Sequence, residues 1–304
     1  MNISIMITTR NRRDDLYRTL SRLRKLMPGP EEIIVCADGC TDDTIEMVRT
    51  DFPEATLIQN QVGRGSIASR DRMLRMARGE WVLSLDDDSY PVDDGFLARV
   101  EAVCSDHPEA AVITFPELRD EGYASAIKTP DSPGQYVAAY ANCGALMQRA
   151  FYLKQPGFPG QFFHMYEEPD YALQCYAAGM SVWFEPSLVI RHHMSPVQRF
   201  PVRRHHQNAR NELWSVWIRC PWPQLPVVAA FRVWRQFRYT LTEGLMWAMQ
   251  EPLWWWQAIK GMKACAAVRR PITWAAYYAW MKLAREPIFD RATLKLKFIE
   301  TATQ

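Results

Sequence analysis

The chain contains 304 residues, 48% of them hydrophobic and 23% charged, with a formal net charge of +2. This composition is typical of water-soluble globular proteins and excludes a disordered, collagenous or disulfide-scaffold chain. A chain of this length buries most of its apolar surface without disulfides or structural metals. We therefore expect any metal or cofactor to take part in a reaction rather than to stabilise the fold.

Charge is distributed unevenly along the chain. Residues 1–198 carry 19 basic and 28 acidic side chains, a net charge of −9, whereas residues 199–304 carry 17 basic and 6 acidic side chains, a net charge of +11. Ten of the twelve Trp residues also lie in the second part. We predict a domain boundary between them, with one domain over 1–198 and a basic, Trp-rich helical region over 199–304.

The cysteines and the apolar runs bear on the cellular compartment. Seven Cys residues without a CxxC pair indicate neither a disulfide framework nor a zinc cluster, and favour buried thiols in a reducing cytosol. The N-terminus places its charges after a very short apolar run, the wrong order for a signal peptide. No charge-free stretch of the Trp-rich part approaches the ~20 residues of a spanning helix. We expect a cytoplasmic protein that does not cross a membrane.

Short apolar runs alternate with amphipathic segments in the first domain. Strands are predicted at residues 3–8, 33–37, 55–58, 81–85, 111–115 and 181–184. Helices are predicted from the repeat of Leu16, Leu20, Leu23 and Met27, after Thr41, and over residues 66–78, 93–104 and 167–179, while 116–133 is expected to be irregular. The alternation predicts an α/β fold with a mostly parallel sheet and helices on both faces.

Polar residues follow three of these strands. Thr8, Thr9 and Arg10 come after the first strand, Asp38 after the second, and the run Asp86–Asp88 after the fourth. Because ligands of open α/β sheets bind beyond the carboxyl ends of the strands, we expect these groups to meet in one crevice.

The three adjacent carboxylates indicate a cation. Like charges ~4 Å apart repel by ~4 kcal/mol at an effective dielectric of 20, and a bound cation relieves that repulsion. On an extended segment Asp86 and Asp88 face the same way and present oxygens to a hard divalent ion, which also binds phosphate. The alternative is a solvated acidic turn, but the position directly after an apolar strand favours the metal site.

Other residues could contact a nucleotide. The carboxylate of Asp38 could accept a hydrogen bond from the N3–H of a pyrimidine. Arg64, Arg70 and Arg72, near the start of the third helix, could reach phosphate with a bidentate fork. The alternative for these arginines is a solvated helix face.

A second acidic cluster, Glu167 and Glu168, lies between an aromatic run and a helix start. A carboxylate beside aromatic side chains is partly desolvated, which raises its pKa toward that of a general base. The alternative is an acidic first turn that complements the helix dipole, the role expected for Asp170. His192 and His193 are also ambiguous, because a neutral imidazole near the Asp cluster would complete a metal site, whereas a lone His is more often a packed core residue.

Several motifs, in this order, resemble those of family 2 glycosyltransferases of the GT-A type, over about residues 3–215. The segments are MITTRNRRDDL, EIIVCADGCTDDT, NQVGRGSIASRDRMLRMARGEWVLSLDDDS and FFHMYEEPDYALQCYAAGMSVWFEPSLVIRHH. The resemblance implies an inverting enzyme that uses Mn²⁺ or Mg²⁺ to transfer a sugar from a UDP- or dTDP-linked nucleotide-sugar donor to an acceptor hydroxyl. Synthesis of cell-surface polysaccharide or lipid-linked glycans is the role expected.

The resemblance also implies a role for each matching residue. Nucleoside contacts are expected from Thr9, Arg10 and Asp38, binding of the metal and the donor diphosphate from Asp86 and Asp88, and base catalysis from Glu168, with Glu167 as the second candidate. His192 falls on the family's His and is expected as a further metal ligand, and Asp87 and Arg70 are expected to contact the donor. The family often has two consecutive Asp where this chain has Ala37-Asp38, so base recognition rests on Asp38 alone, and uridine and thymidine both stay open.

The basic, Trp-rich region admits two interpretations. Arg and Trp side by side on helical segments suit a surface that lies on an anionic membrane, where a lipid-linked acceptor would be found. The alternative is a subdomain that packs its Trp residues inward and leaves Arg in water. Nucleic-acid binding is disfavoured, because the acidic first part would repel phosphate backbones and no known module is visible.

Two rival functions remain at this stage. A nucleotidyltransferase that makes sugar nucleotides would share the α/β sheet, but it usually has a Gly-rich loop after the first strand, whereas Gly63-Arg64-Gly65 follows the third. A glycosyltransferase-like binding protein that has lost catalysis is the other rival. The presence of Asp86, Asp88 and Glu168 argues against it.

Overall fold

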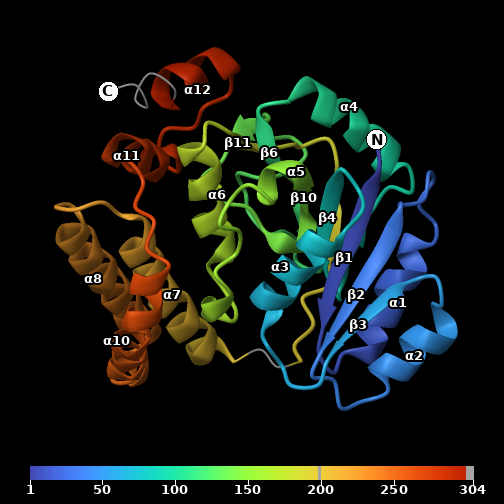
Figure 1. Ribbon diagram of the computed structural model, residues 1–304, viewed down its shortest axis with the longest axis horizontal. Coiled ribbons are helices and arrows are strands. Elements are labelled where there is room, and N and C mark those ends of the chain that lie inside the picture. Colours follow the sequence, from blue (N-terminus) through green and yellow to red (C-terminus); the bar gives the residue numbers. More distant parts are fainter. Residues whose placement is uncertain (198–199, 299–304) are drawn as a thin grey trace.

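The structure is a computed structural model that describes residues 1–197 and 200–298 (Figure 1). Its central sheet has eight strands in the order β3-β2-β1-β4-β10-β6-β11-β9. Their bounds are β1 (Ile3–Thr9), β2 (Glu32–Asp38), β3 (Thr56–Asn60), β4 (Trp81–Asp86), β6 (Ala110–Thr114), β9 (Gln135–Tyr136), β10 (Ala145–Gln148) and β11 (Ser181–Phe184). Neighbouring strands are parallel except at β10, which is antiparallel to β4 and β6, and at β9, which is antiparallel to β11.

Helices cover both faces of this sheet, which confirms the predicted fold class. The helices of the first part are α1 (Arg13–Leu23), α2 (Thr44–Asp51), α3 (Ser66–Met76), α4 (Phe96–Asp106), α5 (Arg149–Tyr152) and α6 (Glu167–Ala177). Around the first strands, α1 and α2 lie on one side and α3 on the other (Figure 1). All seven residues of β1 are buried, as expected for a strand covered on both faces.

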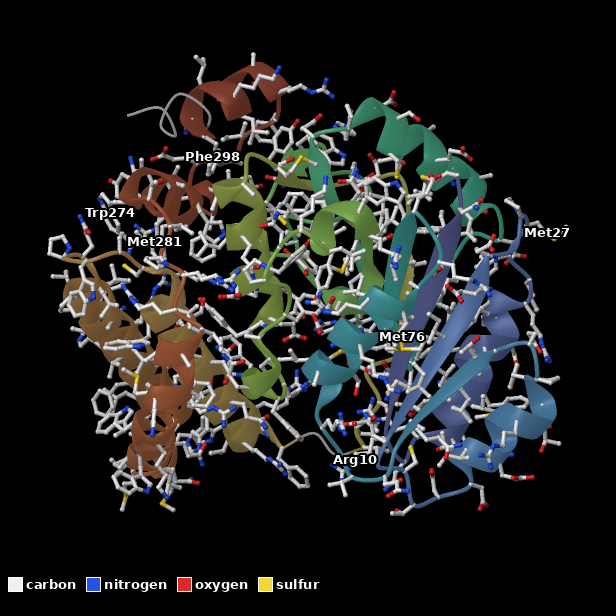
Figure 2. The ribbon with its side chains drawn as sticks, in the orientation of Figure 1. Arg10, Met27, Met76, Trp274, Met281 and Phe298 are labelled. Carbon is white, nitrogen blue, oxygen red and sulfur yellow. The ribbon has the colours of Figure 1, made fainter. Side chains whose placement is uncertain are left out.

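The first helix is shorter than its sequence pattern predicts. Helix α1 ends at Leu23, and Leu26, not Met27, takes the next buried place, with 3% of its surface exposed against 75% for Met27 (Figure 2). The prediction that Met27 continues the helix was therefore wrong. Pro28 accounts for the difference, because a residue before proline is pushed away from the α conformation.

A second, four-stranded sheet flanks the first and has the order β5-β12-β7-β8. Its strands are β5 (Ser89–Pro91), β7 (Glu117–Arg119), β8 (Gly122–Tyr123) and β12 (Ile190–His192). The prediction that residues 116–133 are irregular was wrong for β7 and β8. Strands of two or three residues show no periodicity, and β7 exists because it pairs with β12 about seventy residues later, with Ile190 opposite Glu117.

The predicted C-terminal helical region is confirmed. It comprises α7 (Pro201–Arg219), α8 (Leu225–Glu243), α9 (Leu245–Ala248), α10 (Glu251–Ala267), α11 (Trp274–Leu283) and α12 (Arg291–Phe298). The predicted boundary between residues 198 and 199 lies outside the described residues. The hydrophobic core is continuous across it, because Trp214, Ile218 and Trp280 belong to the same buried cluster as β1 and β4. Among the described residues, no helix combines the length and the hydropathy needed to span a bilayer.

A buried ion pair joins α6 to α7. Asp170 Oδ1 accepts hydrogen bonds from Ser215 Oγ at 2.7 Å and from Arg219 Nε at 3.1 Å, and its Oδ2 accepts one from Arg219 Nη2 at 3.0 Å. Asp170 is fully buried and Arg219 is 4% exposed. Asp170 thus lies in the first turn of α6, as predicted, and also ties the C-terminal helical region to the sheet domain.

Candidate active site

A cavity of about 500 Å³ opens at the carboxyl edge of the central sheet. The ends of β1, β2 and β4 contribute Thr9, Asp38 and Asp86 to its walls, because these strands are neighbours and Thr8 pairs with Asp86. Figure 2 shows Arg10 at this end of β1. Glu167 and Glu168 line the same cavity. The strand ends that we expected to meet in one crevice therefore do so, and the paired glutamates share it.

The Asp run forms a tight turn and not the extended segment that we assumed. Strand β4 ends at Asp86, and the turn is held by Ser89 Oγ, which accepts the Asp86 N–H at 2.8 Å. The turn still brings Asp86 Oδ2 and Asp88 Oδ1 to one point, at 3.8 and 3.1 Å from His192 Nε2. The convergence of these three residues was predicted, but its cause is the turn together with the pairing of β12 with β5.

The imidazole of His192 lies between carboxylates. Its Nδ1 is 2.6 Å from Glu117 Oε1, opposite the nitrogen that faces the Asp pair. Burial disfavours the protonated imidazole, but the hydrogen bonds to Asp88, Cys143 and Glu117 outweigh it and raise the pKa of His192 to about 12. Burial likewise opposes the ionisation of Asp88, yet its bonds from His192 and the Ser195 N–H hold the pKa of Asp88 at about 2.

These donors fit a divalent cation. Oxygens of Asp86 and Asp88 and one nitrogen of His192 lie within 4.8 Å of one another, and carboxylate oxygens with one imidazole suit Mn²⁺. A carboxylate on the second nitrogen, here Glu117, is the usual support for a metal-bound His, since it fixes the tautomer and the ring orientation. Sequence reasoning missed Glu117, although it follows β6, whose carboxyl end lies at the same sheet edge.

Two arginines hold the acidic groups in place. Arg70, which is 4% exposed, bonds Glu167 Oε1 through Nη1 at 3.1 Å and Asp86 Oδ1 through Nη2. Arg12, missed as an individual residue, bonds Asp87 Oδ1 at 2.8 Å. Burial raises the pKa of Asp87 to about 7, and the charge of Arg12 opposes that rise. Arg70 therefore positions carboxylates, and a direct contact between Arg70 and phosphate stays a prediction.

The predicted nucleoside residues, Thr9, Arg10 and Asp38, also line the cavity. Asp38 is 5% exposed, and its carboxylate accepts the N–H of Arg64 and of Gly65, in the loop just before α3, each at 2.8 Å. Its Oδ1 also accepts from Asn60 Nδ2 at 2.7 Å. Because these neighbours occupy most of this carboxylate, a pyrimidine contact at Asp38 stays a prediction. Thr9 Oγ1 is buried without a hydrogen-bond partner among the described residues.

The two glutamates differ in environment. Glu167 is 2% exposed, and its Oε1 accepts from Arg70 and from Asn142 Nδ2, each at 3.1 Å. Glu168 is only partly buried and faces the cavity. Burial raises the pKa of Glu168, the negative charge of Glu167 raises it further, and Arg70 partly offsets both effects. Glu167 is thus held by its neighbours, whereas Glu168 is the more exposed of the two, and its role as the base stays a prediction.

The loop before α6 is strained. Phe163, Met165 and Tyr166 have φ values of 68°, 76° and 74°, a region that such residues rarely adopt. Asn211 of α7 holds the loop, because its Nδ2 donates to the carbonyl oxygens of Phe162, His164 and Met165 at 2.8–3.1 Å. Strained backbone that is fixed by its surroundings is frequent at functional sites.

Helix α7 forms part of the cavity wall, which sequence reasoning did not foresee. Its contribution comes from Arg203, Arg204, Gln207 and Asn208, with Phe200 just before it. These residues lie more than a hundred positions after the Asp run, and no local signal connects the two. The C-terminal helical region is therefore part of the candidate active site.

The sequence places the chain in a known family. The profile described as Glycosyl transferase family 2 matches residues 4–167, more than half of the chain. With the α/β fold and the acidic cavity, this match defines an enzyme that transfers sugars. The chain belongs to glycosyl transferase family 2, as its motifs predicted.

Curated relatives are distant glycosyltransferases. The chain is 30% identical over 89 residues to the UDP-Glc:alpha-D-GlcNAc-diphosphoundecaprenol beta-1,3-glucosyltransferase WfaP of Escherichia coli, a match that spans 29% of this chain and 36% of WfaP. It is 26% identical over 184 residues to the uncharacterized glycosyltransferase YwdF of Bacillus subtilis (strain 168), spanning 57% of this chain and 68% of YwdF. The chain thus covers about a third of WfaP.

Solved structures confirm the GT-A type of fold. S. aureus TarS 1–349 in complex with UDP has a TM-score of 0.62 at 17% identity, over 94% of this chain and 92% of that one. The mannosyltransferase PcManGT from Pyrobaculum calidifontis, in complex with GDP-Man and Mn²⁺, has a TM-score of 0.60 at 17% identity, over 99% of this chain and 86% of that one.

Proposed function

We propose that the protein transfers a sugar, with inversion and dependent on a divalent cation, from a nucleotide-sugar donor to an acceptor hydroxyl. The observation that carries the proposal is that one cavity is lined by Asp86 and His192 of the candidate metal site and also by Glu168. A single displacement requires a leaving-group site and a base that reach the same substrate. Synthesis of a cell-surface polysaccharide or a lipid-linked glycan is the role that we infer.

Asp86, Asp88 and His192 would hold Mn²⁺ or Mg²⁺, and their donor set supports this assignment. A bound cation would neutralise charge that develops on the departing nucleoside diphosphate. Asp87, paired with Arg12, would support the donor beside them. Similar structures contain UDP-GlcNAc, or GDP-Man with Mn²⁺, and the resemblance of the motifs favours a UDP- or dTDP-linked donor that meets Thr9, Arg10 and Asp38.

Glu168 would act as the general base. Its carboxylate would take the acceptor hydroxyl's proton while that oxygen forms a bond to the anomeric carbon. The bond from this carbon to the donor phosphate breaks, and its electron pair leaves with the nucleoside diphosphate. Attack from the face opposite the leaving group inverts the configuration. Glu167, bonded to Arg70 and Asn142, would fix the position of Glu168.

We also infer that the protein works at the cytoplasmic face of a membrane. Helices α8, α9 and α10, with the turn between the last two, expose large apolar side chains, which we call the exposed apolar face: Val227, Phe231, Trp234, Leu245, Met246, Met249, Leu253, Trp256 and Ile259. Cations lie on its aromatic rings, with Arg238 5.4 Å from the Trp234 centroid and Lys260 4.9 Å from that of Trp256. Trp flanked by Lys and Arg suits the headgroup level of an anionic bilayer.

Product analysis tests the reaction. The protein is incubated with Mn²⁺ and a panel of nucleotide sugars, and released phosphates are measured. Nucleoside diphosphate release supports the transferase. Pyrophosphate release in a parallel assay with a nucleoside triphosphate and a sugar 1-phosphate supports a nucleotidyltransferase, and no release in either assay supports a binding protein. We expect Asp88→Ala to lose metal-dependent donor binding. Glu168→Gln should keep donor binding and lose turnover by ~10²–10⁴-fold. Full turnover in Glu168→Gln would exclude Glu168 as the base.

Vesicle sedimentation tests the membrane surface. We expect binding to vesicles with anionic lipid, weaker at high salt because the cations contribute by charge. Replacing Trp234 and Trp256 by Ser should reduce binding, while Trp254→Phe, a change inside the core, should not. Binding that ignores both salt and the two substitutions would reject this surface.

A further inference from the structure

A second cavity adjoins the candidate active site. It has a volume of about 640 Å³ and lies between α7 and α10. Residues that line both cavities are Phe163, Phe200, Arg203 and Gln207. A ligand that enters the first cavity can therefore extend along α7 into the second.

The two cavities differ in the charged groups that line them. The first contains six carboxylates, those of Asp38, Asp86, Asp87, Glu117, Glu167 and Glu168, together with six arginines, Arg10, Arg12, Arg70, Arg119, Arg203 and Arg204. The second, as far as the described residues go, is lined by no carboxylate and instead by Arg203, Arg210, His206 and the amides of three glutamines, Gln207, Gln250 and Gln257. Such a lining repels cations and attracts anions.

Arg210 and His206 in the second cavity can form further hydrogen bonds or ion pairs with a ligand. Arg210 donates to two neutral oxygens, from Nη2 to the Phe162 carbonyl at 2.9 Å and from Nε to Asn211 Oδ1 at 3.0 Å. No carboxylate of the described chain pairs with it. His206 is 8% exposed, and its Nε2 is buried without a hydrogen-bond partner among the described residues. A buried polar atom without a partner calls for an explanation, and a bound ligand provides one.

We propose that this second cavity binds a phosphoryl group of the acceptor. The proposal rests on the proposed function, which places the acceptor hydroxyl at Glu168 and leaves the rest of the acceptor to extend past Phe163 and Phe200. Guanidinium groups bind phosphate with a bidentate fork, and imidazole and amide N–H groups add further donors. The cation site in the first cavity serves the donor's phosphates, so the second cavity is free for the acceptor.

The surroundings of the second cavity fit a phosphate ester with an apolar substituent. Leu253 lines the cavity and is also 57% exposed on the exposed apolar face. A chain attached to the bound phosphoryl group would therefore leave the cavity along α10 toward the proposed membrane surface. A water-soluble sugar phosphate shares the same phosphoryl chemistry without this chain.

Calorimetric titration of the full chain in EDTA tests the site, with inorganic pyrophosphate and farnesyl diphosphate as probes. EDTA removes metal ions from the first cavity. His206 and Arg210 line only the second cavity, so their substitution shows which cavity binds the probes. We expect both to bind, and the double variant His206→Gln/Arg210→Gln to lose affinity about tenfold or more. Tighter binding of farnesyl diphosphate identifies a lipid-linked acceptor, and equal affinities identify a soluble phosphate ester; either outcome supports the phosphoryl site.

Controls separate this inference from the proposed function. Lys263→Gln removes an exposed cation from α10 outside the cavity and should bind both probes like the unchanged chain. Arg210→Lys keeps the charge and should retain more affinity than Arg210→Gln, even if both lose stability. UDP binding with Mn²⁺ should survive in the double variant. If the double variant binds the probes as tightly as the unchanged chain, the phosphoryl site is excluded and the proposed function is not affected. If the unchanged chain does not bind UDP, the proposed function is excluded.

Discussion

At the scale of single residues, the contrast between Glu167 and Glu168 sets the expected pH dependence. The base must be ionised to accept a proton, so activity should fall as pH drops through the pKa of Glu168. That pKa is raised by burial and by the charge of Glu167. The loss of activity should therefore occur at a pH above ~4.3, the ordinary pKa of a glutamate side chain. Profiles of kcat/KM against pH for nucleoside diphosphate release would measure it.

Glu167→Gln should shift this acid limb. The substitution keeps the shape of the side chain and removes the neighbouring negative charge, while Arg70 stays nearby. The loss of the Glu167 charge and the remaining positive charge of Arg70 both favour the ionised form of Glu168. The pKa of Glu168 therefore falls, and activity persists to lower pH. An acid limb at the same pH in Glu167→Gln would mean that another group titrates there.

Substitution of Glu117 tests the candidate metal site. Its carboxylate accepts from His192 Nδ1, so Glu117→Gln weakens the fixing of the ring without removing a metal ligand. Such changes typically cost ~10–100-fold in metal affinity. We expect that loss in a Mn²⁺ titration of the full chain, with fold and thermal stability otherwise kept. Glu121→Gln, a change at the exposed turn after β7, is the matched control. Equal metal affinity in both variants would contradict the support by Glu117.

At the scale of elements, the sequence predicts the strands that build the first half of the site. Asp38 and Asp86 were placed correctly because each follows a long buried strand, and parallel neighbours end at the same edge. The second sheet was missed because its short strands pair residues far apart in the chain. Glu117 stayed hidden for the same reason: its partner His192 is 75 positions away.

The loop that carries the glutamates depends on another element, α7. Asn211 is fully buried and satisfies three carbonyl groups of the strained segment. We expect Asn211→Ala to lower the free energy of unfolding by about 2 kcal/mol, since it leaves buried acceptors unsatisfied. Turnover should fall as well, with donor KM unchanged, because Glu168 follows this loop. Urea denaturation and steady-state kinetics measure the two effects.

A matched variant sharpens this test. Asn211→Asp keeps the size of the side chain but faces the same carbonyl oxygens with acceptors, so it should destabilise at least as much as Asn211→Ala. Normal turnover in either variant would show that the loop keeps its conformation without α7.

At the scale of the whole molecule, composition indicates two parts, but packing joins them. The charge and Trp distributions change near residue 199 because the C-terminal helices are basic and aromatic. Those distributions do not report which residues touch. Trp214 is buried in the core shared with the sheet domain, while Trp234 and Trp256 are more than half exposed. The inward-packing interpretation therefore holds for Trp214, while the membrane interpretation stays a proposal for the exposed Trp234 and Trp256.

This packing predicts one cooperative unfolding transition. Most Trp residues lie after residue 199, so Trp fluorescence reports mainly on the C-terminal helices, whereas far-ultraviolet circular dichroism reports on the whole fold. We expect the two urea curves to coincide because the Asp170–Arg219 pair and the shared core join the parts. If the curves separate and the fluorescence changes at lower urea, the residues after 199 unfold as an independent domain.

Asp170 provides the variant for this last test. Asp170→Asn leaves Arg219 buried without its counter-charge, which should cost about 3–5 kcal/mol. Adding Arg219→Met removes the uncompensated charge, so the double variant should recover part of that stability. If the two parts fold as a unit, Asp170→Asn shifts the fluorescence and dichroism curves together to lower urea. A shift of the fluorescence curve alone would mean that the pair stabilises only the C-terminal helices.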